Sequence, residues 1–177
     1  MLQHIRLNRG LDIPLKGVAV ATVSKTVTPD IIALKPTDFK ALVPKLLVKE
    51  GEAVKAGTLL FCDKERPEIG FASPCSGTVE AIVRGDRRKL LEVRIKADKT
   101  TDYIHFQIPD IKAISKEDVI RLLLESGLWP VIKQRPFGIV ASPKDEPKAI
   151  FISGFNSAPL AADLNFILKD EADYLQV

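Results

Sequence analysis

A regular spacing of glycines and apolar residues between Leu47 and Ile82 is the strongest constraint on how this chain folds. The spacing reads Val48-x-x-Gly51-x-x-Val54-x-x-Gly57-x-x-Leu60, followed by Ser73-Pro74-x-x-Gly77-x-Val79. Glycine adopts positive φ values without steric cost, so Gly51 and Gly57 permit tight turns. Val54 and Leu60 then fall where a compact β fold can bury them, and the second stretch shapes the turn into a later strand.

The rest of the first hundred residues also favours β structure. Val18–Val23 and Asp30–Leu34 are short apolar runs bounded by turn residues, and Thr78–Val83 alternates apolar and polar residues. The clearest alternation is in Leu91–Ala97, where one face holds Leu91, Val93, Ile95 and Ala97 and the other holds Glu92, Arg94 and Lys96. Many short strands with turns between them predict a barrel or a sandwich.

The pattern becomes helical after about residue 104. Ser115 and Asp118 have the spacing of a capping box, and Ile114 and Val119 have that of a hydrophobic staple. Apolar residues then recur at helical spacing until Gly127, where a glycine predicts the end of the helix.

Beyond this helix the sequence predicts the opening of an α/β domain. Phe137–Ala141 and Ala149–Ser153 resemble buried strands, Gly154–Pro159 is a predicted turn, and Leu160 to about Leu168 is a predicted helix. These few elements make a thin sheet with exposed edges, so the sequence is expected to be the N-terminal piece of a longer protein. The predicted domains are residues 1–103 and 104–177.

Composition excludes several classes of function. No apolar stretch has the roughly 18 residues that a membrane helix needs, and Met1–Arg9 is neither a signal peptide nor an anchor. Residues 1–100 hold 18 Lys and Arg against 12 Asp and Glu, but the basic residues are scattered, which argues against nucleic acid. Cys62 and Cys75 are predicted to be buried free thiols. No metal site is expected, because neither histidine has ligands at suitable spacing.

The glycine pattern resembles that of biotinyl and lipoyl carrier domains, whose fold is a flattened barrel of two intertwined β halves. Lys64 lies near the position of the modified lysine in such carriers. Its context, Cys62-Asp-Lys-Glu-Arg-Pro-Glu68, lacks the flanking residues that modifying enzymes read, and the connection to Ser73-Pro74 is longer than in carriers. We therefore expect Lys64 to be an unmodified, exposed hairpin lysine.

Further motifs resemble the A subunit of the bacterial Na+-translocating NADH:quinone oxidoreductases, over essentially the whole chain. These motifs are Asn8–Pro14, Phe61–Pro67, Phe71–Val79, Arg84–Val93, Ser126–Trp129, Gln134–Phe137, Ala149–Ile152 and Asn156–Asp163. The resemblance implies an α+β chain: a biotinyl/lipoyl-like β barrel-sandwich hybrid followed by the start of an α/β (Rossmann-like) domain. That second portion is similar to the flavin-binding subunit of respiratory complex I and to the C subunit of the Rnf complex.

The resemblance implies a peripheral scaffold and docking subunit of a sodium-pumping NADH:quinone reductase, close to the quinone-reduction site. Such a complex uses NADH, flavins, iron-sulfur centres and quinone, and we expect this chain to bind none of these cofactors and to have no activity alone. The expected partners are the other subunits, especially the flavin-carrying membrane subunit. The expected place is the cytoplasmic face of the inner membrane, with membrane contact only through partners. The alternatives are a free-standing lipoyl-like carrier and an independent flavin-binding electron-transfer protein.

The segment Gly127–Gly138 departs from the flavin-binding relatives. Those proteins use closely spaced glycines, which let backbone amides approach a phosphate, whereas here the chain is bulky and no G-x-G-x-x-G motif occurs. We therefore expect a lost flavin site. Trp129, Lys133 and Arg135 are the candidate residues for contact with a partner or the quinone side, since tryptophan and arginine often anchor interfaces. No catalytic residue is identified. Arg84, Arg87, Arg88 and Lys89 form a basic cluster at a predicted hairpin tip, either solvated or docking on an acidic surface or on lipid headgroups.

Overall fold

The computed structural model describes residues 16–17, 20–23, 25–110, 112–153, 158, 161 and 163–168 of the chain. The chain divides into two compact units. One spans Val27–Glu146, and the other combines Met1–Thr26 with Pro147–Val177. The larger unit contains every described helix and strand except α2 (Leu164–Ile167).

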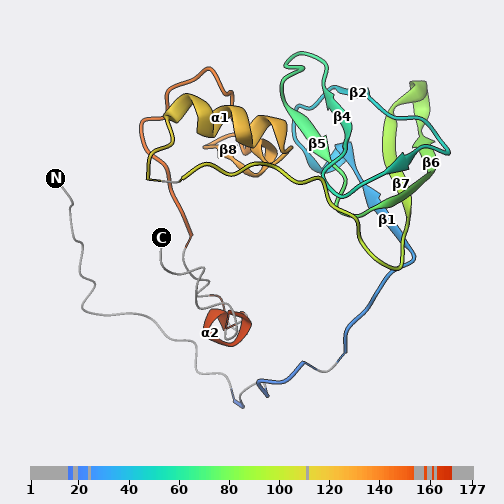
Figure 1. Cartoon of the computed structure of the whole chain (residues 1–177), viewed down its shortest axis with the longest axis horizontal. Coiled ribbons are helices and arrows are strands. Elements are labelled where there is room, and N and C mark those ends of the chain that lie inside the picture. The colour runs from blue at the N-terminus through green and yellow to red at the C-terminus, as the bar shows by residue number, and fades with distance from the viewer. Residues whose placement is uncertain are drawn as a thin grey trace. The chain divides into compact units, whose positions relative to one another are not determined.

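Seven strands of the larger unit form two small antiparallel sheets (Figure 1). The four-stranded sheet has the order β1-β7-β6-β3, and the three-stranded sheet has the order β2-β4-β5. Their bounds are β1 Ile31–Leu34, β2 Pro44–Leu46, β3 Ala53–Val54, β4 Leu59–Asp63, β5 Gly70–Ala72, β6 Gly77–Arg84 and β7 Leu90–Ala97. This arrangement confirms the predicted β unit, including the strand at Asp30–Leu34.

The hairpin of β6 and β7 is the longest pairing in the fold. Its register runs from Gly77 opposite Ala97 to Arg84 opposite Leu90, with irregularities after Val79 and after Val83. Val93 and Ile95 are completely buried while Arg94 and Lys96 are exposed, as the alternation predicted.

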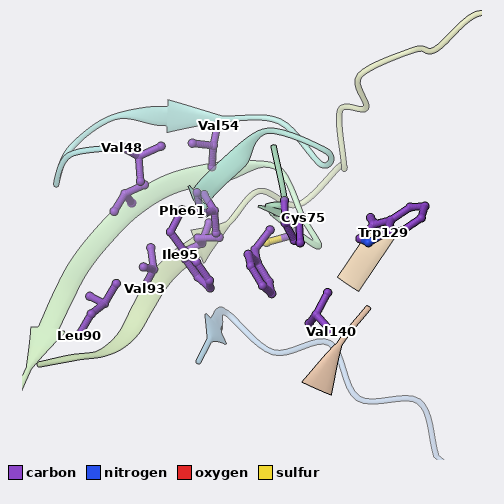
Figure 2. Close-up of a cluster of buried hydrophobic side chains, with 13 residues drawn as sticks. Val48, Val54, Phe61, Cys75, Leu90, Val93, Ile95, Trp129 and Val140 are labelled. Atoms are coloured by element: carbon purple, nitrogen blue, oxygen red, sulfur yellow. The ribbon is translucent and has the colours of Figure 1, made fainter. Parts of the chain in front are cut away.

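The two sheets enclose one hydrophobic core. Leu60 and Phe61 from the three-stranded sheet and Val93 and Ile95 from the four-stranded sheet all have 0% exposure. The ring of Phe61 stacks on that of Phe71 with a centroid distance of 4.8 Å. Figure 2 shows these side chains converging from both sheets, with Leu90 at one end of the cluster and Trp129 at the other.

The glycine pattern has the predicted conformations. Gly51 and Gly57 have φ values of 81° and 99°, which confirms the two tight turns. The Gly51 amide donates to the Val79 carbonyl at 2.8 Å, and the Gly57 amide donates to the Ser73 carbonyl at 2.9 Å. Both turns are therefore tied to the part of the chain that carries the second half of the pattern.

The predicted helix is α1 (Lys116–Glu125). The Ser115 hydroxyl accepts the Asp118 amide at 3.1 Å and donates to the Asp118 carboxylate at 2.7 Å, so the cap forms through side chains at both positions. The hydrogen bond from Ser115, and then the guanidinium of Arg121, lower the pKa of Asp118. Gly127 has a φ of 70°, and the Leu128 amide donates to Leu123 at 3.0 Å, which is the glycine-terminated end that the sequence predicted.

Within the larger unit, residues 126–146, which follow α1, pack on the two sheets. They contain η3 (Trp129–Val131) and the two-stranded hairpin of β8 (Lys133–Gln134) and β9 (Ile139–Val140). A Cβ on Gly127 would lie 2.7 Å from the Cβ of Ala72 in β5, so the helix end and the sheet are in close contact. The compact unit Val27–Glu146 thus continues past residue 104, and the predicted division into residues 1–103 and 104–177 stays a prediction.

Two predicted strands are wrong. Of Val18–Val23 the structure describes residues 20–23, which form no strand, and Val20 is 80% exposed. Ala149–Ser153 also forms no strand, and Phe151 within it is 91% exposed. A strand requires a hydrogen-bonded neighbour, and the structure gives neither run a strand neighbour among the described residues. The apolar composition of each segment suggested a strand, but it does not show whether a neighbouring strand is present.

The remaining predictions fall partly outside the described residues. The helix α2 lies within the predicted Leu160–Leu168, where Leu160 and Ala162 are not described. Of the turn Gly154–Pro159 only Ala158 is described, and the motif Asn8–Pro14 lies wholly outside the described residues. In the part of the chain that the structure describes, no helix combines the length and apolar character needed to cross a membrane.

Gly77 provides a test of this architecture. A Cβ at this position would collide with the backbone carbonyl oxygen of Lys96 on β7. We expect Gly77→Ala to lower the free energy of unfolding by about 3 kcal/mol or more, because backbone would have to move. Gly51→Ala, with open space around it and a φ of 81°, should lose only about 1–2 kcal/mol. Urea unfolding measures both; equal losses would contradict the close approach of the strands.

Candidate functional site

The hairpin between β4 and β5 carries Lys64, the residue nearest to the carrier position. Its side chain is exposed, and its backbone amide donates to the Val43 carbonyl at 2.7 Å. Ile69, at the other end of the connection, is completely buried, and its amide donates to the Arg66 carbonyl at 2.9 Å. Both ends of the connection are therefore held against the barrel.

A buried ion pair closes this hairpin. Asp63 is 2% exposed, and its carboxylate accepts the Arg66 guanidinium at 2.9 Å and 3.0 Å and the Glu65 amide at 3.1 Å. The same guanidinium donates to the carbonyl oxygen of Val140 on β9 at 3.1 Å. We call Asp63, Arg66 and the Val140 carbonyl the hairpin clamp. The sequence did not predict the hairpin clamp, because an Asp and an Arg three residues apart do not reveal a third partner 74 positions from Arg66.

The contribution of the hairpin clamp to stability can be tested by substitution. Arg66→Ala leaves a buried carboxylate without its cation, and we expect a loss of about 2–4 kcal/mol in the free energy of unfolding. The matched double variant Asp63→Asn/Arg66→Gln removes both charges and should recover more than half of that loss. Chemical denaturation of the three proteins measures the effect. A double variant no more stable than Arg66→Ala would show that the charge pair is not the cause.

The segment Gly127–Gly138 contains all three residues predicted to contact a partner. Its β8–β9 hairpin pairs Lys133 with Val140 and Gln134 with Ile139. The Gly138 amide donates to the Gln134 carbonyl at 2.8 Å, and Gly138 has a φ of 67°, so a tight glycine turn joins the two strands.

Trp129 differs from the other two candidates. It is 7% exposed, and its indole Nε1 donates to the Ala141 carbonyl at 2.8 Å. Figure 2 shows Trp129 and Val140 together at one end of the hydrophobic cluster. Lys133 and Arg135 are exposed and make no ion pair with the described residues. Trp129 holds the segment on the barrel, while the side chains of Lys133 and Arg135 face solvent.

Exposed apolar side chains accompany these cations. Val131 is 74% exposed and Phe137 is 65% exposed, and Leu128 is 54% exposed. These three residues lie within ten positions of one another in the chain, and contiguous exposed apolar patches commonly mark interaction surfaces. We call this group, Leu128, Val131, Lys133, Arg135 and Phe137, the docking segment. Its apolar members were not among the residues predicted for the site.

The glycines of this segment are used for packing and turning. Gly127 faces Ala72 and Leu59, so its missing side chain permits contact with the barrel. Gly138, with a φ of 67°, forms the turn between β8 and β9. Among the described residues no three His, Cys, Asp or Glu side chains gather as metal ligands.

The two cysteines are buried free thiols, as predicted. Burial raises the pKa of the Cys75 thiol, and a hydrogen bond with Ser73 partly opposes that shift. A buried thiol with a raised pKa holds little of the reactive thiolate at neutral pH. Cys62 and Cys75, with 4% and 5% exposure, belong to the core.

Two family models match this chain. The model described as the NqrA N-terminal barrel-sandwich hybrid domain covers residues 5–98, more than half of the sequence. The chain belongs to the NqrA family. The model described as the NqrA second alpha/beta domain covers residues 114–177. These matches confirm the predicted fold class, a barrel-sandwich hybrid followed by an α/β portion.

Curated members of the NqrA family are similar along nearly the whole chain. A protein from Yersinia pseudotuberculosis (serotype O:1b, strain IP 31758) is 37% identical over 171 residues, which are 96% of this chain and 38% of the relative. Proteins from Serratia proteamaculans (strain 568) and Haemophilus influenzae (strain PittGG) are 35% and 33% identical. All three are named as the A subunit of the Na(+)-translocating NADH-quinone reductase. The chain spans 38% of the length of these relatives.

Proposed function

We propose that this chain is the N-terminal part of the A subunit of a sodium-translocating NADH:quinone reductase, and that it serves there as a scaffold and docking element. Its similarity to relatives of that name, which extends over both matched domains, is the main support. NADH, flavins, iron-sulfur centres and quinone belong to the complex in this proposal. The chain itself binds none of them and contributes to NADH:quinone reduction only within the assembly.

The docking segment is the observation that carries the docking role. Its cations Lys133 and Arg135 stand beside exposed apolar side chains on a hairpin that Trp129 and the hairpin clamp fix to the barrel. A rigid surface of this kind loses little conformational freedom on binding, which favours affinity. An apolar patch with cations suits a partner that offers apolar side chains flanked by carboxylates.

The proposed partner is the flavin-carrying membrane subunit, on the cytoplasmic face of the inner membrane and close to the site of quinone reduction. Contact with the bilayer then passes through that partner. The exposed apolar group at Leu128, Val131 and Phe137 supports a protein partner, because such residues are normally covered in an assembled state. The place next to the quinone site rests on the resemblance to the family.

No observation favours the two alternative functions. A carrier needs a modified lysine on a hairpin that swings between active sites. The hairpin of Lys64 is tied by the Lys64 amide to Val43 and by Arg66 to Val140. An independent flavoprotein needs a phosphate cradle, and Gly127 is instead packed against Ala72.

We expect charge removal in the docking segment to weaken assembly without lowering the stability of the chain. A tagged chain carrying Lys133→Gln/Arg135→Gln, made in a bacterium that has the complex, should retain its melting temperature. It should also recover at least about fivefold less of the partner subunits, because interface anchors typically contribute more than about 1 kcal/mol. The control Lys45→Gln/Lys99→Gln removes the same charge from other exposed positions and should assemble normally. Co-purification followed by quantitative mass spectrometry gives the measurement.

Trp129→Ala serves as the contrasting variant. Truncation of a buried Trp with a lost hydrogen bond should lower the free energy of unfolding by about 3–5 kcal/mol. Normal assembly of the Lys133→Gln/Arg135→Gln variant would show that the docking segment is not the contact surface. A wild-type chain that recovers no other subunit would contradict the proposed function as a whole.

The intact mass of the purified chain tests the carrier alternative. We expect the mass of the unmodified sequence, since the residues around Lys64 lack the context of a carrier lysine. A lipoyl or biotinyl increment that disappears in Lys64→Arg would favour a carrier. An absorption spectrum of the same sample tests the flavoprotein alternative. We expect no flavin bands.

A further inference from the structure

The β6–β7 hairpin extends beyond its neighbours in the sheet. β1 pairs only with residues 93–96 of β7, and β3 pairs only with Gly77 and Thr78 of β6. Nearer its turn the hairpin has no further strand neighbour among the described residues, although the Glu50 carboxylate accepts the Ile82 amide at 2.7 Å. The hairpin ends in a tip at residues 84–89. Figure 1 shows the connection of β6 to β7 at the outer edge of the sheet.

The tip has a backbone conformation that disfavours the residues found in it. The Lys89 amide donates to the Asp86 carbonyl at 3.1 Å across Arg87 and Arg88, whose φ values are 54° and 62°. Two successive residues at positive φ define a type I′ turn, in which Asn-Gly is strongly preferred. Residues with a Cβ adopt this region only under strain. Two arginines thus occupy a turn whose backbone conformation disfavours them.

The electrostatic surroundings of the tip leave its cations available. Arg87, Arg88 and Lys89 are exposed and form no ion pair with any described residue. By contrast, Arg94 on the same hairpin pairs with Glu92 at 2.8 Å. Within residues 84–89 only Asp86 is acidic.

The tip is also internally braced. The Arg84 guanidinium donates to the carbonyl oxygen of Arg88 at 3.1 Å, and the Gly85 amide donates to the Lys89 carbonyl at 2.8 Å. Arg87 and Arg88 therefore project from a defined backbone, which preorganises two guanidinium groups for binding. Guanidinium groups bind carboxylates through two parallel hydrogen bonds.

We infer that Arg87 and Arg88 form a second docking surface, which binds a carboxylate-bearing surface of another subunit of the complex. This inference rests on the proposed function, because it requires a subunit partner. The partner surface carries at least two carboxylates in positions that match the two arginines of the turn. The hairpin tip and the docking segment then hold the chain through separate surfaces, one polar and one partly apolar.

A protein surface fits the tip better than a lipid surface. Membrane attachment through basic residues needs a second contribution, such as an acyl chain or an inserted apolar face. Residues 84–89 contain no apolar side chain, and Leu90, which follows them, is buried. The fixed turn also suits a protein partner whose carboxylates have defined positions. Lipid headgroups are mobile and can bind without a fixed arrangement of cations.

The variant Arg87→Asn/Arg88→Gly tests the inference without weakening the fold. Asn-Gly is the preferred pair for this turn, so the melting temperature should stay the same or rise. The tagged wild-type chain and the variant are made in a bacterium that has the complex, and the recovered subunits are quantified at about 50 to about 500 mM sodium chloride. We expect the variant to recover on the order of tenfold less partner at low salt. Its remaining association should depend less on salt than that of the wild type.

Four outcomes decide the result. The control Lys45→Gln/Lys99→Gln loses the same charge and should recover partners like the wild type, so an equal loss there would overturn the inference. Recovery by Arg87→Asn/Arg88→Gly equal to the wild type overturns it as well, while leaving the proposed function intact. A wild-type chain that recovers no other subunit overturns both. Vesicles of phosphatidylcholine with about one third phosphatidylserine give the last arm. If the wild-type chain binds these vesicles and Arg87→Asn/Arg88→Gly does not, the tip binds a lipid surface. That result would overturn the inference of a protein partner.

Discussion

The contact between the two small sheets is the constraint on which the other features depend. Neither sheet buries its inner face without the other, and the side chains of Phe61 and Ile95 have no exposure because the sheets close on each other. The turns at Gly51 and Gly57 bring the halves together, and their amides bond across to the second half. The absence of a side chain at Gly77 then lets β6 approach the backbone of β7. The packing of the core thus depends on the geometry of these glycine positions.

Residues 126–146 of the larger unit depend on the barrel for their position. Trp129 and Val140 enter the same hydrophobic cluster, and Arg66 bonds to the Val140 carbonyl. A short two-stranded hairpin is marginal by itself in water, so the β8–β9 hairpin takes its order from these contacts. The hairpin that bears the modified lysine in carrier proteins here anchors a neighbouring segment.

The fixed barrel presents two sets of unpaired cations with different surroundings. Lys133 and Arg135 stand among exposed apolar side chains, whereas Arg87 and Arg88 stand on a polar turn with a strained backbone. We propose that both surfaces recognise partners. In that proposal, rigidly placed charge and apolar area supply the affinity, whereas pairs such as Asp63 with Arg66 stabilise the fold.

Local rules were enough to predict the elements whose causes lie within a few residues. The turns at Gly51 and Gly57, the alternation of β7, the cap at Ser115 and the helix end at Gly127 follow from φ preferences, side-chain alternation and capping chemistry. Membership of the NqrA family was also readable from the ordered motifs. The same rules placed Trp129 in the candidate site but could not tell a core side chain from an exposed one.

Features that need a distant partner depend on the tertiary structure. The sequence of Ala149–Ser153 is that of a buried strand, yet a strand exists only beside another strand. Asp63 and Arg66 form the hairpin clamp only because β9 brings the Val140 carbonyl to the guanidinium. Arg87 and Arg88 have positive φ values only because they form the turn that closes the β6–β7 hairpin. Turns, strand faces and helix ends could be read from the residues themselves, because their interactions are local. Which side chains are covered could not, because burial depends on segments that are far apart in the chain.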